Sequence, residues 1–262
     1  MRDYREIAPS PRFAAAIECF WTGHSDGGTH RVTPDGCADI LLSGGALRLV
    51  GPMTGWRDFA LEPGERLFGV RFRPGRWRAV AGPPADRLTD RLLPMDDLWG
   101  ARAARLGGQL AEARSAAQAI HAVEAALPAP ADASPIERAL AWMERRRGAV
   151  SMDELASHAG LSPRQLRRVC LERTGLTPKF LARVLRFRHA QERLAAQRPP
   201  VPGRAPSALV DLALDCGYYD QAHFIHEFRE FSGRTPAAAA PLGPDDRFFQ
   251  SPADGDAVTS AA

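Results

Sequence analysis

Two stretches of the sequence, about 55 residues apart, follow the same order of residue types. In the first, residues 152–175, a short helical run ends at a glycine, and a second helical run begins shortly after it. Gly160 can adopt the positive φ that closes a helix, Ser162 can cap the next helix, and Pro163 suits its first turn. The second stretch, residues 209–233, repeats this order. The pattern predicts two helix-turn-helix units.

The second unit adds an aromatic stripe. Gly217 stands in the place of Gly160, and Asp220 can cap the helix that follows. Three phenylalanines recur at helical spacing and predict the buried face of that helix: Phe224, Phe228 and Phe231. Between the two units, residues 178–197 are predicted to form one long helix. Such a helix would be a rigid spacer that fixes the separation of the two units.

Positive charge is concentrated in the same part of the chain. The whole sequence has a formal net charge of +3, but residues 134–238 hold 17 Arg and Lys against 11 Asp and Glu. Residues 134–206 hold 15 basic and 6 acidic residues, whereas residues 207–238 hold 2 and 5. A segregated positive surface attracts a polyanion. We expect the first unit and the spacer to supply most of this attraction, and the second unit to bring Glu227 and Glu230 toward the polyanion.

Three arginines stand near the start of the second helix of the first unit. Leu166 and Cys170 are expected on its buried face. Arg164, Arg167 and Arg168 therefore lie on the opposite, exposed face. A recognition helix enters the major groove of DNA by its first turns, where arginine can contact guanine through two hydrogen bonds. The exposed start of the corresponding helix in the second unit is formed by Gln221, Ala222, Ile225 and His226.

Residues 135–236 resemble the DNA-binding domain of the AraC/XylS family of transcription regulators. The first unit carries Leu155-Ala-x-x-Ala-Gly-Leu-Ser and Thr174-Gly-Leu-Thr-Pro. The second carries Leu212-Ala-x-x-x-Gly-Tyr-x-Asp-Gln-Ala-His-Phe-x-x-x-Phe and Gly233-x-Thr-Pro. The resemblance implies two recognition helices in successive major grooves on one face of promoter DNA. It assigns the base-facing positions to Arg164, Arg167 and Arg168, and to Gln221, Ala222, Ile225 and His226.

The first hundred residues predict a β-rich domain. Short apolar runs separated by turn signals are expected to form strands at residues 17–21, 40–42, 47–50 and 68–72. In the last of these, Phe68, Val70 and Phe72 alternate with Gly69 and Arg71, which predicts one buried and one wet face. One or two helices are expected within residues 97–127, and their apolar stripe is either a dimer seam or a packing face inside the domain.

The predicted fold class is α+β, with an N-terminal β-rich domain, for which a cupin-like form is one option, and a C-terminal all-α domain. Residues 1–127 form the proposed regulatory domain, and the proline-rich residues 128–133 form the linker. Residues 134–238 form the double helix-turn-helix domain, and residues 239–262 are expected to be a disordered tail. No apolar run is long enough for a membrane span and no secretory signal is present, so we expect a cytoplasmic protein.

The N-terminal part resembles a poorly characterised domain that precedes such DNA-binding units. The resemblance rests on Phe20-Trp21, on Arg31 with Pro34-Asp-Gly-x-x-Asp39, and on Gly69-Val-Arg-Phe-x-Pro-Gly75. It implies control by a small effector whose binding residues the sequence does not assign. Further partners that the family resemblance allows are RNA polymerase and a second copy of the chain.

An alternative function is an enzyme or a cysteine redox module that the C-terminal domain directs to DNA. Cys37 would need a lowered thiol pKa for this role. His24, His30, Asp35 and Asp39 are of metal-ligand types, but the His-x-His pair of metal-binding cupins is absent. Because no paired-carboxylate or Cys/His motif supports catalysis, we expect a regulator that is not an enzyme, with no catalytic residue, no metal and no cofactor.

Overall fold

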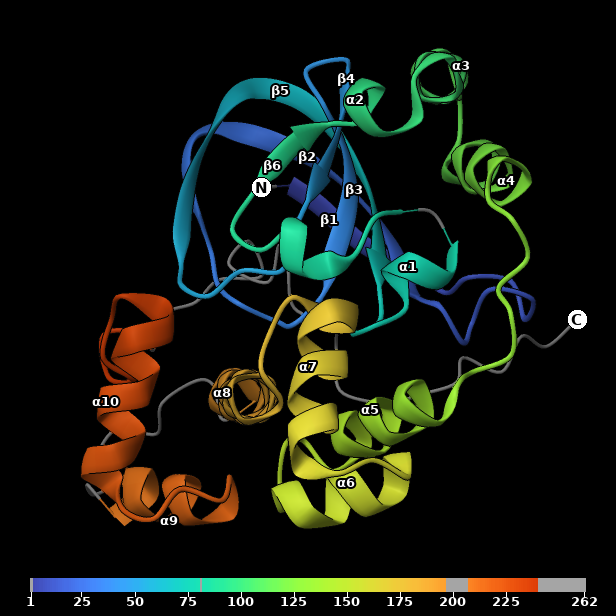
Figure 1. Cartoon of the computed structure of the whole chain (residues 1–262). Coiled ribbons are helices and arrows are strands. Elements are labelled where there is room, and N and C mark those ends of the chain that lie inside the picture. The colour runs from blue at the N-terminus through green and yellow to red at the C-terminus, as the bar shows by residue number, and fades with distance from the viewer. Residues whose placement is uncertain (1, 81, 197–206, 240–262) are drawn as a thin grey trace, which may run out of the picture.

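The computed structural model describes residues 2–80, 82–196 and 207–239. It contains a single six-stranded antiparallel sheet in the order β1-β2-β5-β3-β4-β6 (Figure 1). The strands are β1 (Arg2–Ile7), β2 (Ile17–Val32), β3 (Ala38–Ser43), β4 (Ala46–Val50), β5 (Arg57–Phe72) and β6 (Leu92–Pro94). All four runs predicted as strands lie in β2 to β5. The edge strands β1 and β6 were not predicted.

The helices follow in two groups. The first group comprises α1 (Trp77–Val80), the 3₁₀ helix η1 (Ala85–Arg87), α2 (Asp96–Trp99), α3 (Ala101–Glu112) and α4 (Ala116–Ala126). The second group comprises α5 (Pro135–Arg145), α6 (Met152–Ala159), α7 (Pro163–Thr174), α8 (Pro178–Ala196), α9 (Ser207–Asp215) and α10 (Gln221–Ser232). The predicted α+β class is confirmed. No described helix is long and apolar enough to cross a membrane.

The predicted linker, residues 128–133, contains no helix or strand. Directly after it, the backbone N–H of Ser134 donates to Glu137 Oε2 over 2.8 Å, which fixes the start of α5 as the sequence predicts. The division of the chain into two domains stays a prediction. The connector after α8 and almost all of the expected tail lie outside the described residues.

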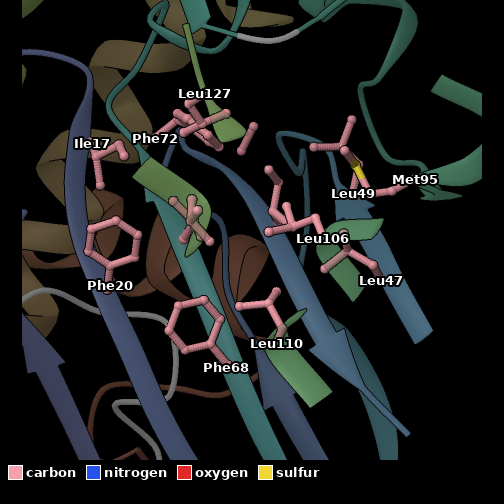
Figure 2. Close-up of a cluster of buried hydrophobic side chains, with 14 of the residues drawn as sticks. Ile17, Phe20, Leu47, Leu49, Phe68, Phe72, Met95, Leu106, Leu110 and Leu127 are labelled. Carbon is pink, nitrogen blue, oxygen red and sulfur yellow. The ribbon is translucent and has the colours of Figure 1, made fainter. Parts of the chain in front are cut away.

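One face of the sheet is covered by α3 and α4. Phe20, Phe68 and Leu47 point from the strands into a core that Leu106 and Leu110 of α3 complete from the other side (Figure 2). Burial of such apolar surface is the main stabilising term of the domain. The stripe between residues 106 and 127 is therefore a packing face inside the domain, because Leu106, Leu110, Ala119, Val123 and Leu127 are all buried here.

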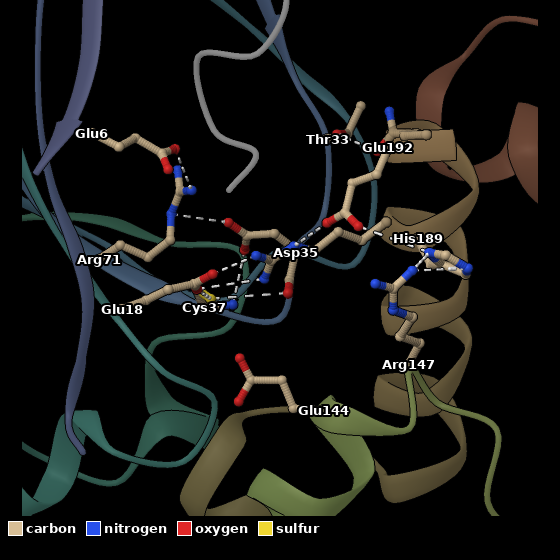
Figure 3. Close-up of polar contacts among 12 residues, drawn as sticks. Glu6, Glu18, Thr33, Asp35, Cys37, Arg71, Glu144, Arg147, His189 and Glu192 are labelled. Carbon is tan, nitrogen blue, oxygen red and sulfur yellow. Dashed lines mark hydrogen bonds and ion pairs between the residues drawn. The ribbon is translucent and has the colours of Figure 1, made fainter. Parts of the chain in front are cut away.

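From Leu67 to Phe72 the opposite face of β5 is also buried, so the prediction of a wet face at Gly69 and Arg71 was wrong. Gly69 lies beneath the Trp21 ring, where an added Cβ would come within 1.9 Å of the indole. The Arg71 side chain is fully buried. Its Nε lies 3.4 Å from an Asp35 carboxylate oxygen (Figure 3). The same atom lies 3.5 Å from a carboxylate oxygen of Asp39. An alternating strand therefore packs apolar residues on one side and a buried ion-pair cluster on the other.

The Trp21 ring donates a hydrogen bond from Nε1 to Asp39 Oδ1 over 3.1 Å. Trp21, Asp35, Asp39, Gly69 and Arg71, which carry the N-terminal resemblance, thus come together as structural contacts. Burial raises the pKa of Asp39 to about 7, while the Arg71 guanidinium opposes this rise. The folded protein consequently holds a proton on Asp39 at pH values at which the unfolded chain has released it.

This difference in pKa predicts a pH dependence of stability. Because the folded pKa is raised, the free energy of unfolding should increase as the pH falls from 8 toward 5, by up to about 1.4 kcal/mol per unit below pH 7. Asp39→Asn, which keeps an acceptor for Trp21, should remove this contribution. Urea unfolding followed by tryptophan fluorescence at pH 8, 7, 6 and 5 measures both proteins.

The control is Asp58→Asn, because the hydrogen bond from Arg31 lowers the pKa of that exposed carboxyl and moves its titration below this range. The Asp58 variant should follow the wild-type pH profile. Parallel pH profiles for wild type and Asp39→Asn would contradict the assignment of the buried proton to Asp39.

Candidate nucleic-acid interface

The first helix-turn-helix unit forms as predicted. Gly160 ends α6 with φ of 64°, a backbone conformation that glycine adopts without steric cost. Ser162 then caps α7, and Gln165 Oε1 accepts a hydrogen bond from the Ser162 backbone N–H over 3.0 Å. Leu166 and Cys170 are buried on the inner face of α7. The local sequence therefore fixes both the turn and the face that α7 presents to solvent.

The three predicted arginines all lie on that exposed face of α7. Arg164, Arg167 and Arg168 are exposed. Arg168 has only a long contact, 3.9 Å, with Glu172 one turn later. Arg173, at the other end of α7, faces the buried Glu137 at 3.6 Å. The arginines that can reach a ligand are thus those of the first two turns.

The second unit has the same construction. Asp220 Oδ1 accepts a hydrogen bond from the His223 backbone N–H over 2.7 Å and caps α10. The predicted aromatic stripe is confirmed, since Phe224, Phe228 and Phe231 are fully buried. At the start of α10, Ala222 and His226 are exposed and Gln221 and Ile225 are half-buried. The structure brings these four residues together at one end of one helix.

Helix α8 is the predicted spacer, and it belongs to the cores of both units. Leu181, Ala182 and Leu185 pack in the first core, and Val184, Phe187 and Ala190 pack in the second. In Figure 1, α7 and α10 lie on either side of α8, which is seen end-on. Both recognition helices begin on the side away from the sheet (Figure 1). The seven candidate contact residues therefore lie at the far side of the molecule from the β-domain.

Glu227 and Glu230 do not bring unpaired negative charge toward a polyanion, as the charge count suggested, because both are paired with arginines of α8. Arg183 Nε lies 2.7 Å from Glu227 Oε2, and Arg183 Nη2 lies 2.5 Å from Glu230 Oε2. Arg186 adds a second cation to Glu227 at 3.5 Å. The side chain of Glu227 is only 1% exposed. These acids neutralise arginines of α8, so a charge count along the sequence overstates both the acidity of the second unit and the basicity of the spacer.

A cleft of about 740 Å³ separates the two units. Its polar lining comes from three helices: Ser151 before α6, Lys179, Arg183 and Arg186 of α8, and His223, His226, Glu227 and Glu230 of α10. Arg183 and Arg186 are paired with Glu227 and Glu230 in this cleft, and the exposed Lys179 adds a further positive charge to it. The sequence analysis missed Lys179, although it is the one lysine in the chain and directly follows a Thr-Pro that starts α8.

The N-terminal candidates do not form a reactive site. Cys37 is buried, and burial raises the pKa of its thiol well above the ordinary value, with the nearby Asp35 and Glu18 carboxylates adding to the rise (Figure 3). A thiol held protonated is the unreactive form. Asp35 and Asp39 face Arg71. No group of three His, Cys, Asp or Glu within the described ranges could hold a metal ion.

Two family models match the chain. One, described as a domain of unknown function (DUF6597), matches residues 5–94, and the other, described as a helix-turn-helix domain, matches residues 155–240. The second match coincides with the two units built around α8. No curated protein sequence is similar enough to match.

Several solved structures resemble the chain. A transcriptional regulator with an AraC-type DNA-binding domain from Chromobacterium violaceum is 26% identical, covers 41% of this chain and 93% of its own, and has a TM-score of 0.34. The C-terminal domain of AraT, a response regulator from Geobacillus stearothermophilus, is 21% identical over 48% and 96%, with a TM-score of 0.35. Fatty-acid-bound ToxT from Vibrio cholerae is 9% identical over 83% and 91%, with a TM-score of 0.43.

Proposed function

The C-terminal part of the chain is an AraC-type helix-turn-helix DNA-binding domain, and from this premise we propose that the protein is a sequence-specific transcription regulator controlled by a small effector. The observation that carries the proposal is the pair of recognition helices packed on α8, both with their first turns directed away from the β-domain. Two such helices on one rigid support can enter successive major grooves on one face of DNA. Action on chromosomal DNA implies a cytoplasmic location.

The side chains divide by chemistry into base-contacting and phosphate-contacting sets. Arg164, Arg167 and Arg168 can each donate two hydrogen bonds to guanine in the first major groove. Gln221 suits adenine in the second groove, Ala222 and Ile225 suit a thymine methyl, and His226 can bond a base edge. Lys179 and the start of α6, which face the cleft between the units, suit the sugar-phosphate backbone that crosses between the two grooves.

The N-terminal domain is proposed to bind the effector, because it is β-rich and a proline-rich segment joins it to the DNA-binding helices. RNA polymerase and a second copy of the chain are the other partners we propose. Selection of DNA from a random pool by the full-length protein, followed by a genome-wide footprint, tests the function. Absence of any enriched sequence would overturn it.

We expect Arg164→Ala and Arg167→Ala each to weaken binding to the selected operator by about 1 to 3 kcal/mol, because each removes hydrogen bonds to a base edge. Binding to random DNA should fall much less. Titration of labelled operator and random duplex at fixed salt measures both. Arg105→Ala, which removes an exposed arginine of α3, is the matched control and should leave both affinities unchanged. Equal losses on operator and random DNA would mean that these arginines contact phosphate only.

The two units should contribute unequally. The start of α7 exposes three arginines, whereas Gln221, Ala222 and Ile225 at the start of α10 are uncharged, so the first unit should supply most of the attraction to phosphate. Scrambling the half-site of the first unit should abolish specific binding, and scrambling the other should cost clearly less. Competition binding at fixed salt decides this. The half-site of the first unit is the one whose scrambling no longer changes the affinity of the Arg167→Ala variant. Equal losses would contradict the asymmetry.

An effector that binds the N-terminal domain should raise the melting temperature of the full-length protein by mass action and change its affinity for the operator. A metabolite screen by thermal shift, with operator titration of each hit, measures both. If no compound alters either quantity while the protein still regulates its target promoter, the proposed effector control is wrong and the protein acts constitutively.

A further inference from the structure

Both recognition helices end in the same short motif. Helix α7 is followed by Gly175-Leu-Thr-Pro and α10 by Gly233-Arg-Thr-Pro. The two glycines share nearly the same left-handed conformation, with φ of 72° and 71°. Each also lies against the N-terminal domain, although the two contact points are on different segments of that domain. The equivalent ends of both recognition helices therefore contact the same domain.

The first contact joins the end of α7 to the segment after η1. Thr89 Oγ1 donates a hydrogen bond to the carbonyl oxygen of Gly175 over 2.8 Å. An added Cβ on Gly175 would lie 2.5 Å from Thr89 Oγ1 and 2.8 Å from the Ala85 carbonyl oxygen, so only glycine permits this approach. Arg78 of α1 also pairs with Glu172 of α7.

A buried ion pair reinforces the first contact. Arg76, from the loop after β5, lies 3.0 Å from Glu137 Oε2 of α5, and both side chains are almost fully buried. The other oxygen of Glu137 lies 3.6 Å from Arg173 in the last turn of α7. Glu137 thereby links the N-terminal domain to the same end of the recognition helix. Breaking a buried pair of this kind leaves an uncompensated charge, so the contact resists separation.

The second contact joins the end of α10 to the end of β2 and to the residue that precedes β5. An added Cβ on Gly233 would lie 2.7 Å from the Trp56 ring and 2.9 Å from Arg31 Nη1. The Arg31 guanidinium is stacked 3.8 Å from the centre of the Trp56 ring. It also donates two hydrogen bonds of 2.8 Å to the Asp58 carboxylate. Trp56 is thus fixed as a flat surface against the end of α10.

A third attachment lies between these two, on α8. An added Cβ on Gly36 would lie 2.7 Å from Leu181 Cδ1, and Arg188 pairs with Glu18 of β2 in the interface. A helix-turn-helix unit that packs on α8 alone can pivot about that helix. The contacts at Gly175 and Gly233 lie off the α8 axis, on either side of it, and they remove this freedom for both units.

We propose that Thr89 and Trp56, which lie outside the DNA-binding domain, are positioning residues that set the half-site spacing the protein accepts. The inference rests on the proposed DNA-binding function and names a determinant of its specificity. One base pair inserted between half-sites moves the second by about 3.4 Å and rotates it by about 35°. A protein whose two units are clamped at three points cannot follow that displacement. A protein whose two units are held by α8 alone can follow part of this displacement.

The test uses full-length protein and the operator selected by the wild type, with zero, one or two base pairs inserted or removed between the half-sites. Wild type should lose about tenfold or more in affinity for each base pair. The double variant Thr89→Val/Trp56→Ala should lose less than about threefold per base pair, while its affinity for an isolated first half-site stays at the wild-type value. Each single variant should fall between the two.

Three comparisons guard against loss of the fold. Thr89→Ser keeps the hydroxyl donor and should keep the wild-type discrimination. Arg105→Ala and Gln109→Ala change exposed side chains of α3, a helix that lies across the sheet from α7 and α10 (Figure 1), and should also behave as wild type. If the double variant does not fold, Thr89→Val alone against Thr89→Ser decides the question.

Full tenfold discrimination in the folded valine variants would overturn the inference and leave α8 and the ion pairs of Arg76 and Arg78 as the determinants of spacing. Equal weakening at every spacing would also overturn it, because the contacts would then only stabilise the fold. Failure of the wild type to select any DNA is a different result, which removes the proposed function itself.

Discussion

Helix α8 is shared by two hydrophobic cores, and the arrangement of everything that follows the linker depends on this packing. Alternating groups of its residues, such as Leu181 and Leu185 on one side and Val184 and Phe187 on the other, bury against different units. A helix buried on two sides has little surface left for solvent. Two arginines of α8 form ion pairs with α10 and with the sheet. Arg183 neutralises Glu227 and Glu230, while Arg188 faces Glu18 of the sheet. The spacer is therefore a structural centre, and exposed cations lie on α7, at Lys179 and at the end of α5, where Arg145 and Arg146 are exposed.

The parts of the fold that could be predicted are those that depend on neighbours in the sequence. Ser134, Ser162 and Asp220 cap helices through bonds that reach only three residues along the chain, so residue order alone determines them. The buried stripe of α10 follows from helical periodicity in the same way. Within the candidate interface, the exposure of Arg164, Arg167 and Arg168 follows because the opposite face of α7 is apolar.

The parts that could not be predicted depend on pairs distant in sequence. Arg71 alternates with apolar residues as a solvent-facing residue would. The approach of Glu6 from β1, and of Asp35 and Asp39 from β3 and the loop before it, makes its burial favourable. The pairing of Glu227 with Arg183 joins residues 44 positions apart, so a count of charges could not show that they cancel. The edge strands β1 and β6 are short or polar, and their backbone partners rather than their side chains define them.

The placement of the interdomain contacts has a geometric consequence for control. Each recognition helix has 12 residues, about 18 Å of helix, and is held at its last turn while its first turn is presented outward. A rotation of about 10° at the held end moves the first turn by about 3 Å, close to the rise of one base pair. A displacement of the segment after η1, or of Trp56 before β5, that is too small to disturb the sheet would therefore be enough to misalign a recognition helix with its groove. The proposed effector would therefore not need to separate the domains, because a small local shift at the contacts of Gly175 and Gly233 would change the register on DNA.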